Sequence, residues 1–205
     1  VFLCEVRELA GHHPRLSVLG KQSAPPLPCR VTLCQSIPKG KLFESIVQKA
    51  TELGAARVVP LLAERGVSRP DPAAAGAKCE KWRQVAIEAI KQCGSPWLPR
   101  IEPPVTPAQF LARGEPIELS LVAALEGVRR HPRDCFHEFL DQHRRIPSSA
   151  AVWIGPEGDF TAAELERIKA AGAKPISLGP LVLRTDTAAA YCLSILIYEF
   201  STTPQ

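Results

Sequence analysis

Apolar and polar residues alternate near the start of the chain, over residues 2–6 and again over residues 16–18. Because successive side chains of a strand point to opposite faces, this pattern predicts two short strands around a turn at Gly11-His12-His13-Pro14. Two strands alone do not form a stable domain. A polar, proline-rich stretch over residues 21–28 follows, and its composition is typical of a linker. We therefore expect a domain boundary after residue 28.

From Cys29 onward the pattern alternates between strand and helix. The predicted strands cover residues 30–35, 58–62, 119–124 and 150–155, and the predicted helices cover residues 39–53, 78–93, 133–144 and 162–171. This alternation predicts an α/β domain over residues 29–205, in which helices cover both faces of a mostly parallel sheet. Ligands of such sheets bind beyond the carboxyl ends of the strands, so the loops after Ala124, Gly155 and Leu178 are the places to look for a site.

Composition and charge limit the class of protein. Of 205 residues, 45% are hydrophobic and 22% are charged, as in an ordinary globular protein. The formal net charge of +4 is compatible with a polyanionic partner but does not require one. Seven cysteines, without a Cys-x-x-Cys pair or a histidine cluster, favour a reducing cytoplasm and argue against a metal site. The longest apolar stretch, residues 188–197, is shorter than the roughly 20 residues that span a membrane.

The strongest candidate for a site is the segment Trp153-Ile154-Gly155-Pro156-Glu157-Gly158-Asp159-Phe160-Thr161, directly after an apolar strand. Its two glycines permit close approach of the backbone to a ligand. Thr161 can cap a helix whose first turn carries Glu164. The simpler alternative is a strand-to-helix turn that needs glycine for its own geometry.

A second segment, over residues 176–188, joins a short strand to the apolar terminal helix. Arg184 stands there beside Thr185-Asp186-Thr187. Since Thr and Asp are common capping residues, this arrangement predicts either a structural ion pair with a helix cap or part of a site.

These two segments resemble the RsmE family of ribosomal RNA uridine-N3 methyltransferases, in the SPOUT superfamily. The resemblance extends to Ile37-Pro38-Lys39-Gly40-Lys41, to residues 48–54, and to Val59-Pro60-Leu61 followed by Glu64-Arg65. The blocks match in order and spacing over nearly the whole chain. The resemblance implies a cytoplasmic enzyme that uses S-adenosylmethionine to methylate N3 of a uridine in 16S ribosomal RNA, within the assembled small subunit.

The resemblance also has implications for architecture. It implies a C-terminal trefoil knot, which general fold rules treat as a rare exception. It implies that residues 1–28 are the tail and linker of an N-terminal PUA-like β-barrel that binds RNA. Finally, it implies a homodimer that packs the terminal helix near Tyr191, Ile195 and Tyr198 against its partner.

Roles for individual residues follow from the same resemblance. Arg184 is expected to stabilise the uracil oxygens or a phosphate, because arginine stays charged and donates two hydrogen bonds side by side. Asp186 and Glu157 are candidates for orienting Arg184 or for accepting the proton of N3. The predicted cofactor-binding residues are Ala124, Leu125, Ile154, Gly155, Pro156, Gly158, Leu178, Gly179 and Leu183. The predicted RNA-binding residues are Lys39, Lys41, Arg65, Lys81, Arg83 and Lys91.

The chain departs from the usual family pattern at three positions. Asp159 stands where a third glycine is common, and Asp186 replaces the usual glutamate. Ser95 stands where an arginine is expected, so one phosphate contact is expected to be lost or to lie elsewhere. Two other functions stay open: another SPOUT methyltransferase that acts on transfer RNA or on ribose 2′-O, and a non-catalytic RNA-binding factor of ribosome assembly.

Several other residues are expected to be structural. Trp82 and Trp153 are predicted to lie in the core, as are the thiols of Cys34, Cys93 and Cys192. The sequence contains neither a G-x-x-x-x-G-K-[ST] loop nor a G-x-G-x-x-G fingerprint, so nucleotide hydrolysis and dehydrogenation are poorly supported.

Overall fold

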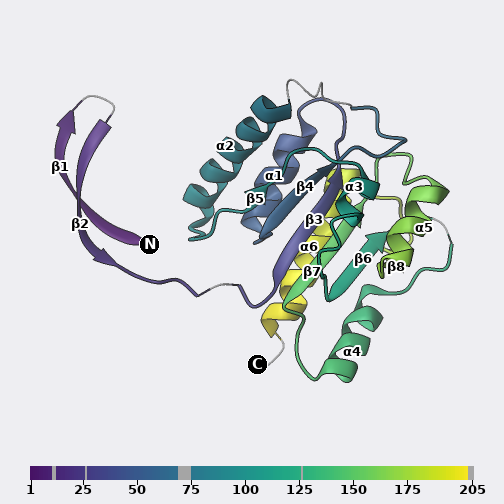
Figure 1. Cartoon of the computed structure of the whole chain (residues 1–205). Coiled ribbons are helices and arrows are strands. Elements are labelled where there is room, and N and C mark those ends of the chain that lie inside the picture. The colour runs from purple at the N-terminus through teal and green to yellow at the C-terminus, as the bar shows by residue number, and fades with distance from the viewer. Residues whose placement is uncertain (11–12, 26, 69–74, 126, 203–205) are drawn as a thin grey trace.

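The computed structural model describes residues 1–10, 13–25, 27–68, 75–125 and 127–202. A two-stranded ribbon leads into a larger α/β unit (Figure 1). The strands are β1 (Phe2–Ala10), β2 (His13–Lys21), β3 (Arg30–Ser36), β4 (Arg57–Leu61), β5 (Arg100–Ile101), β6 (Leu119–Ala123), β7 (Ser149–Ile154) and β8 (Lys174–Ile176). The helices are α1 (Leu42–Glu52), α2 (Ala75–Cys93), α3 (Pro107–Leu111), α4 (Pro132–His143), α5 (Ala162–Ala170) and α6 (Thr185–Thr202).

Six strands form one sheet in the order β5-β4-β3-β7-β6-β8. Every pair in it is parallel, as the alternation of strands and helices predicts. All the carboxyl ends therefore lie at one edge of the sheet. Loops that are far apart in the sequence meet at this edge.

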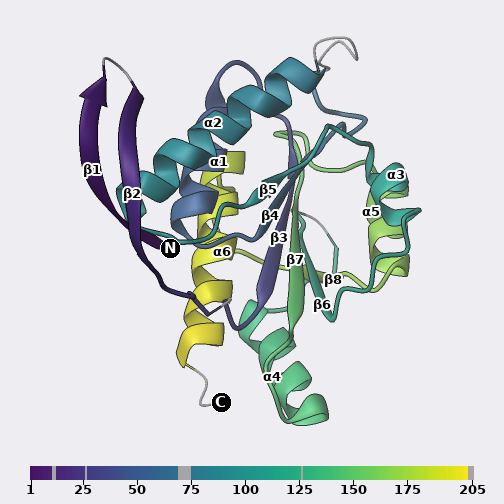
Figure 2. The ribbon, with the colours of Figure 1, turned by 60° about the vertical axis from the view of Figure 1, so that its left-hand side comes forward.

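Helices cover both faces of the sheet, which confirms the predicted α/β class. Val31 and Leu33 of β3 point to the face packed against α1, α2 and α6, while Cys34 points to the face packed against α3 and α5. Figures 1 and 2 show these two helical layers on either side of the strands. The predicted core position of Trp82 in α2 is also confirmed, because its ring is buried against Phe43, with 4.4 Å between the ring centroids and 52° between the ring planes.

Some boundaries differ from the predictions. The first helix begins at Leu42 instead of residue 39, because Gly40 has a left-handed backbone (φ 69°) that a helix cannot contain. It ends, as predicted, before Gly54 (φ 78°). The next helix starts at Ala75, ahead of the predicted residue 78. β5 and α3 were not predicted.

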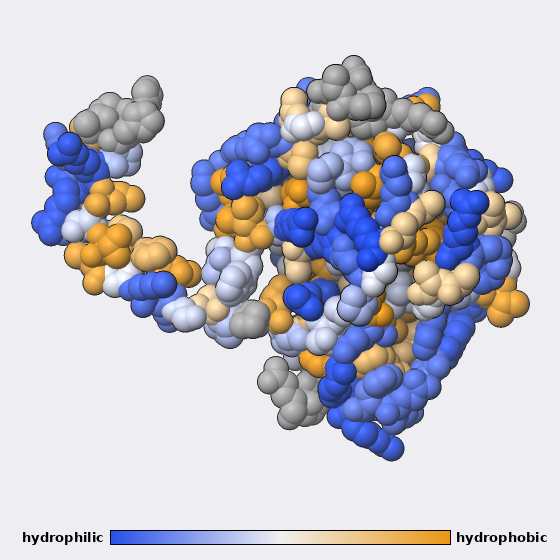
Figure 3. Space-filling model, viewed as in Figure 1, coloured by the Kyte–Doolittle hydropathy of each residue, from blue (hydrophilic) through white to orange (hydrophobic). Residues whose placement is uncertain are grey.

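The predicted N-terminal strands are confirmed, and they pair antiparallel. The predicted turn between them lies partly outside the described residues. Apolar side chains such as Leu9 and Leu19 stay exposed on this ribbon, where orange and blue surfaces alternate (Figure 3). The linker contacts the larger unit, since Trp97 Nε1 donates to the Pro25 carbonyl at 2.9 Å.

All seven cysteines are free thiols. Cys34 and Cys192 are buried, as predicted, but Cys93 is exposed because it lies at the carboxyl end of α2. No helix among the described residues is long and apolar enough to cross a membrane.

Candidate functional site

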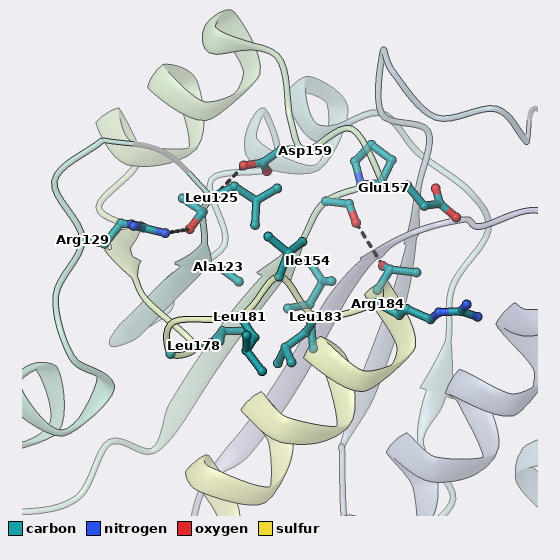
Figure 4. A pocket seen from close by; sticks show the side chains of 17 residues that line it. Ala123, Leu125, Arg129, Ile154, Glu157, Asp159, Leu178, Leu181, Leu183 and Arg184 are labelled. Atoms are coloured by element: carbon teal, nitrogen blue, oxygen red, sulfur yellow. Dashed lines mark hydrogen bonds between the residues drawn. The ribbon is translucent and has the colours of Figure 1, made fainter.

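A cavity of about 250 Å³ opens at the carboxyl edge of the sheet, beyond β6, β7 and β8 (Figure 4). Three loops enclose it, and they are the three loops at which the sequence predicts a site. The predicted cofactor residues that line the cavity are Ala124, Leu125, Ile154, Gly155, Pro156, Leu178, Gly179 and Leu183. The ninth predicted residue, Gly158, does not line it.

The loop after β7 is tightly packed at Gly155. A Cβ atom there would lie 3.0 Å from Asp159 Oδ1 and 3.1 Å from the Phe160 amide nitrogen, so only glycine fits without a shift. The loop ends in the predicted cap of α5. Thr161 Oγ1 accepts from the Glu164 amide and Glu164 accepts from the Thr161 amide, which is a complete capping box.

Gly158 contacts Arg65 and does not line the cavity. Its carbonyl accepts a hydrogen bond of 2.8 Å from Arg65 Nη1. Arg65 was predicted to bind RNA, but in the structure its guanidinium supports the loop that walls the cavity. Next to it, the Glu64 amide donates to Glu164 Oε1 at 2.9 Å, so the segment after β4 is joined to the start of α5.

The loop between β8 and α6 supplies an apolar wall. Leu178 and Leu183 line the cavity together with Ile154 from β7. Gly179 has φ 113°, a conformation that side-chain-bearing residues rarely adopt. Leu181 and Val182, which also line the cavity, remain largely exposed at its mouth.

A chain of buried hydrogen bonds joins this site to β3. Gln35 is fully buried, and its Nε2 donates to Thr185 Oγ1 at 2.8 Å. Thr185 Oγ1 in turn donates to the Gly155 carbonyl at 3.0 Å. Thr185 belongs to the second candidate segment of the sequence, whereas Gln35 was not predicted to belong to the site, because it appears in the sequence only as a polar residue at the end of a strand.

Two of the three predicted catalytic residues line the cavity, and the third does not. Arg184 and Glu157 line the cavity, and Figure 4 shows both at the same end of it. Asp186 lies outside the lining, in the first turn of α6, where its carboxylate is 3.7 Å from Lys49 Nζ. A carboxylate in a first helical turn interacts favourably with the helix dipole, so Asp186 also has a structural role.

The cavity contains a second arginine that the sequence reasoning missed. Arg129 lines it, and its Nη1 donates to the Ala124 carbonyl at 3.3 Å. In the sequence Arg129 is part of a short basic run, which by composition resembles ordinary surface. The folded loop after β6 brings Arg129 to the cavity, which the sequence alone does not show.

Comparison with known proteins decides the family. The model of a family described as "RNA methyltransferase domain" matches residues 25–197. Ribosomal RNA small subunit methyltransferase E from Bacillus subtilis is 35% identical over 175 residues, which are 84% of this chain and 67% of that protein. The chain belongs to this family. The protein of the same name from Synechocystis is 34% identical over 95% of this chain and 61% of its own length, so the chain spans about two thirds of these relatives.

Solved structures agree with the assignment to the methyltransferase family. A putative methyltransferase from Legionella pneumophila, in complex with S-adenosylmethionine, superposes with a TM-score of 0.83 at 31% identity, over 95% of this chain and 77% of that one. Ribosomal RNA small subunit methyltransferase E from Neisseria gonorrhoeae, 24% identical, has the same fold with a TM-score of 0.78 over 95% of this chain and 77% of that one. The family predicted from the sequence is thereby confirmed, and the predicted cofactor is the ligand named in both structures.

The remaining predicted RNA contacts of this methyltransferase domain fall in two places. Lys39 and Lys41 are exposed in the loop after β3, at the same edge of the sheet as the cavity. Along α2 the predicted contacts form ion pairs with nearby carboxylates, which are Lys81 with Glu44 at 2.6 Å, Arg83 with Glu80 at 3.4 Å and Lys91 with Glu88 at 2.7 Å. Such exposed pairs are weak, so they do not prevent these side chains from meeting phosphates. Ser95 turns towards Trp97, whose amide donates to Ser95 Oγ at 3.2 Å.

Proposed function

We propose that this domain binds S-adenosylmethionine in the three-loop cavity and methylates N3 of a uridine in 16S ribosomal RNA. One observation carries the proposal. The loops after β6, β7 and β8 enclose a single cavity with Arg184 and Glu157 at one end, in a chain that belongs to the ribosomal RNA small subunit methyltransferase E family.

The lining of the cavity fits this cofactor. Ile154, Leu178 and Leu183 offer apolar contacts to an adenine ring. Gly155 packs closely against Asp159 and Phe160 of its own loop, which keeps this side of the cavity compact. When bound, the cofactor supplies a methyl group on a sulfonium, which is already strongly electrophilic. The lining therefore has to orient the two reactants and exclude water.

The acceptor nitrogen requires more from the protein. N3 of uridine carries a proton that must leave, and negative charge then spreads to the uracil oxygens. We propose that Arg184, which lines the cavity, stabilises that charge or a neighbouring phosphate, because a guanidinium carries positive charge and two parallel donors. Glu157, in the cavity lining, and Asp186, beside Lys49, are the two carboxylates proposed to orient Arg184 or to accept the proton.

The proposed phosphate-binding surface consists of Lys39, Lys41, Arg65, Lys81, Arg83 and Lys91. Arg65, whose guanidinium supports the glycine loop, lies beside the cavity. Binding through such a set falls as salt rises, since counterions are released from the RNA. The partner we propose is ribosomal RNA within the assembled small subunit, in the cytoplasm.

The strand pairing supports a knotted C-terminus. β8 pairs with β6 along one edge, while Arg130 bonds to the other edge of β8 through the Pro175 carbonyl and the Ser177 amide. The connection that leaves β6 thus returns on the far side of β8. The chain after β8 then reaches α6, which packs on β3 and β7. A trefoil knot accounts for this arrangement, and we propose it.

The ribbon and linker are proposed to be the end of a PUA-like barrel. β1 and β2 expose apolar side chains on a two-stranded sheet, which is not stable alone. Residues 1–28 would then form the RNA-binding tail and residues 29–205 the SPOUT domain.

Methylation with radiolabelled S-adenosylmethionine, on small ribosomal subunits that lack the modification, tests the function. Nucleoside analysis of the RNA should place the label in 3-methyluridine. Label in another nucleoside or in transfer RNA would indicate another SPOUT specificity. Cofactor binding without any label would indicate a non-catalytic RNA-binding factor.

A further inference from the structure

Asp159 has an unusual backbone conformation for a residue with a side chain. Its φ is 60°, in the left-handed region that favours glycine. Among the described residues, Arg144 is the other non-glycine residue with a positive φ, at 55°. Aspartate tolerates this region better than most residues, because its short polar side chain can bond to nearby backbone. In Asp159 the carboxylate forms such bonds.

The carboxylate of Asp159 joins two of the three loops around the cavity. Its Oδ2 accepts from the Leu125 amide at 2.9 Å, and its Oδ1 accepts from the Phe160 amide at 2.7 Å. Leu125 belongs to the loop after β6 and Phe160 to the loop after β7. Figure 4 shows the Asp159 side chain bridging toward Leu125 at the rim of the cavity.

This bridge also determines what Leu125 can offer to a ligand. Its amide hydrogen is already bonded to Asp159, so Leu125 can offer a ligand only its side chain or its carbonyl oxygen. A hydrogen bond that an amide donates to a carboxylate is charge-assisted and stronger than a neutral one. The bond from Leu125 holds the wall formed by Leu125 against the wall formed by Gly155 and Pro156 before any ligand arrives, while the bond from Phe160 fixes the carboxylate within its own loop.

We infer that Asp159 is a positioning residue that preorganises the cofactor cavity by latching the loop after β6 to the loop after β7. The inference rests on the proposed function for its ligand, although the latch itself exists without one. Preorganisation raises affinity by removing the cost of ordering loops on binding. S-Adenosylmethionine and S-adenosylhomocysteine would contact the same loops, so the latch favours both to the same degree.

The variant Asp159→Gly separates the latch from backbone strain. Glycine adopts a positive φ freely but has no carboxylate, so the fold should persist while the latch is lost. Asp159→Asn is a second variant, because asparagine tolerates the same backbone and its side-chain oxygen can accept one of the two amide hydrogens. Arg144→Gly is the matched control, since it relieves a similar backbone at the end of α4, away from the cavity.

Three measurements follow on each variant: amide hydrogen exchange of Leu125 without ligand, calorimetric affinity for both ligands, and steady-state methylation. For Asp159→Gly we expect faster exchange at Leu125 and a Kd about tenfold higher for both ligands, equivalent to about 1.4 kcal/mol. The KM for S-adenosylmethionine should rise with the Kd, while kcat and the KM for RNA stay unchanged. Asp159→Asn should fall between the parent and Asp159→Gly, and Arg144→Gly should match the parent.

The outcomes distinguish this inference from the proposed function. Unchanged exchange at Leu125 in Asp159→Gly, or unchanged affinity when the parent binds the cofactor, would overturn the inference. A parent protein that binds no S-adenosylmethionine would contradict the proposed function instead, and the exchange rate of Leu125 would still decide whether the latch exists. If Asp159→Gly does not fold, the same measurements on Asp159→Asn decide.

Discussion

Gly155 shows how a single hydrogen atom in place of a side chain shapes the cavity. A Cβ atom at this position would press against the side chain of Asp159 and the backbone at Phe160, at 3.0 Å and 3.1 Å. Gly155→Ala should therefore displace the loop and raise the Kd for S-adenosylmethionine by at least about tenfold, or about 1.4 kcal/mol, in a calorimetric titration. Gly76→Ala is the control, since nothing lies within 4 Å of its Cβ position. Unchanged affinity of Gly155→Ala would show that this close approach does not form the binding wall.

Substitution of Arg184 tests the proposed chemistry of the site. It lines the cavity beside Glu157, so Arg184→Ala should remove charge stabilisation from the acceptor while the apolar wall stays in place. Single electrostatic groups of this kind contribute about 100-fold or more to kcat. We expect that loss in single-turnover methylation, with cofactor affinity within a few-fold of the parent. Arg184→Lys should recover little, because lysine lacks the paired donors. Normal turnover of Arg184→Ala would show that its role is only structural.

The residues that sequence reasoning identified and those it missed differ in a physical way. Gly155, Gly179 and Arg184 stand in loops with unusual composition, and such loops can be recognised without a structure. Asp159 and Gln35 act through partners that are distant in sequence, since Gln35 bonds to Thr185 and Asp159 bonds to Leu125. No local pattern encodes these partners. They exist only because parallel strands bring their carboxyl ends together.

At the scale of elements, long periodic segments were predictable and short ones were not. β7 is buried on both faces and appears in the sequence as a continuous apolar run from Ala150 to Ile154. β3 is equally buried, although Thr32 and Gln35 interrupt its apolar residues. β5 and α3 are too short for a period to develop, with two and five residues. Tertiary contacts hold them instead. Glu102 follows β5 and forms ion pairs with Arg57 Nε at 2.7 Å and with Arg113 Nη1 at 2.5 Å.

This ion-pair network makes the edge of the sheet sensitive to acid. Burial alone would raise the pKa of Glu102, but hydrogen bonds from Arg113 and Arg57 outweigh it and hold the pKa below its ordinary value. A separate carboxylate, Glu118 before β6, accepts hydrogen bonds from Arg145 and from the Ser148 amide, and these bonds lower its pKa to about 2. A carboxylate with a lowered folded pKa stabilises the fold above its unfolded pKa of about 4.3, and this contribution is lost as the pH falls through the folded value.

We therefore expect the free energy of unfolding in urea to fall as the pH drops from about 4.5 towards 2. Glu102→Gln should destabilise the protein by about 2 kcal/mol at pH 7, and by less at low pH, because Arg57 and Arg113 lose their buried carboxylate and keep only the more exposed Glu115. Glu80→Gln, which removes an exposed pair with Arg83 at 3.4 Å, should change stability by less than about 0.5 kcal/mol. Equal effects of the two substitutions would contradict a special role for the buried network.

At the scale of the whole molecule, one sheet edge brings together the cavity and part of the proposed phosphate-binding surface. The cavity, Arg184, and the loop with Lys39 and Lys41 all lie beyond the carboxyl ends of the strands. The order of strands along the sheet was not predictable from periodicity. The pairing of β7 between β3 and β6 brings the glycine loop against both the start of α6 and the loop after β6.

α6 begins at this edge and runs back along the sheet, and its outer side bears the proposed dimer contact. Tyr191 is 45% exposed and Tyr198 is 66% exposed, on a helix whose other side is buried in the core. Aromatic side chains of this kind are enriched in interfaces and costly to leave in water. In a dimer with two-fold symmetry the same residue of each copy lies in the contact, so one substitution changes the interface at two places.

Tyr198→Glu should therefore convert dimers into monomers in sedimentation at micromolar concentration, since two like charges would meet at the symmetric contact. Val67→Glu is the control, because it places the same charge at an exposed apolar residue in the loop after β4 and should sediment like the parent. A dimer that survives Tyr198→Glu would place the interface elsewhere, and a monomeric parent would mean that α6 has no partner in a second copy. Cofactor affinity measured on the monomer then shows whether one copy holds a complete cavity, as the single-chain lining of Ile154, Leu178 and Leu183 leads us to expect.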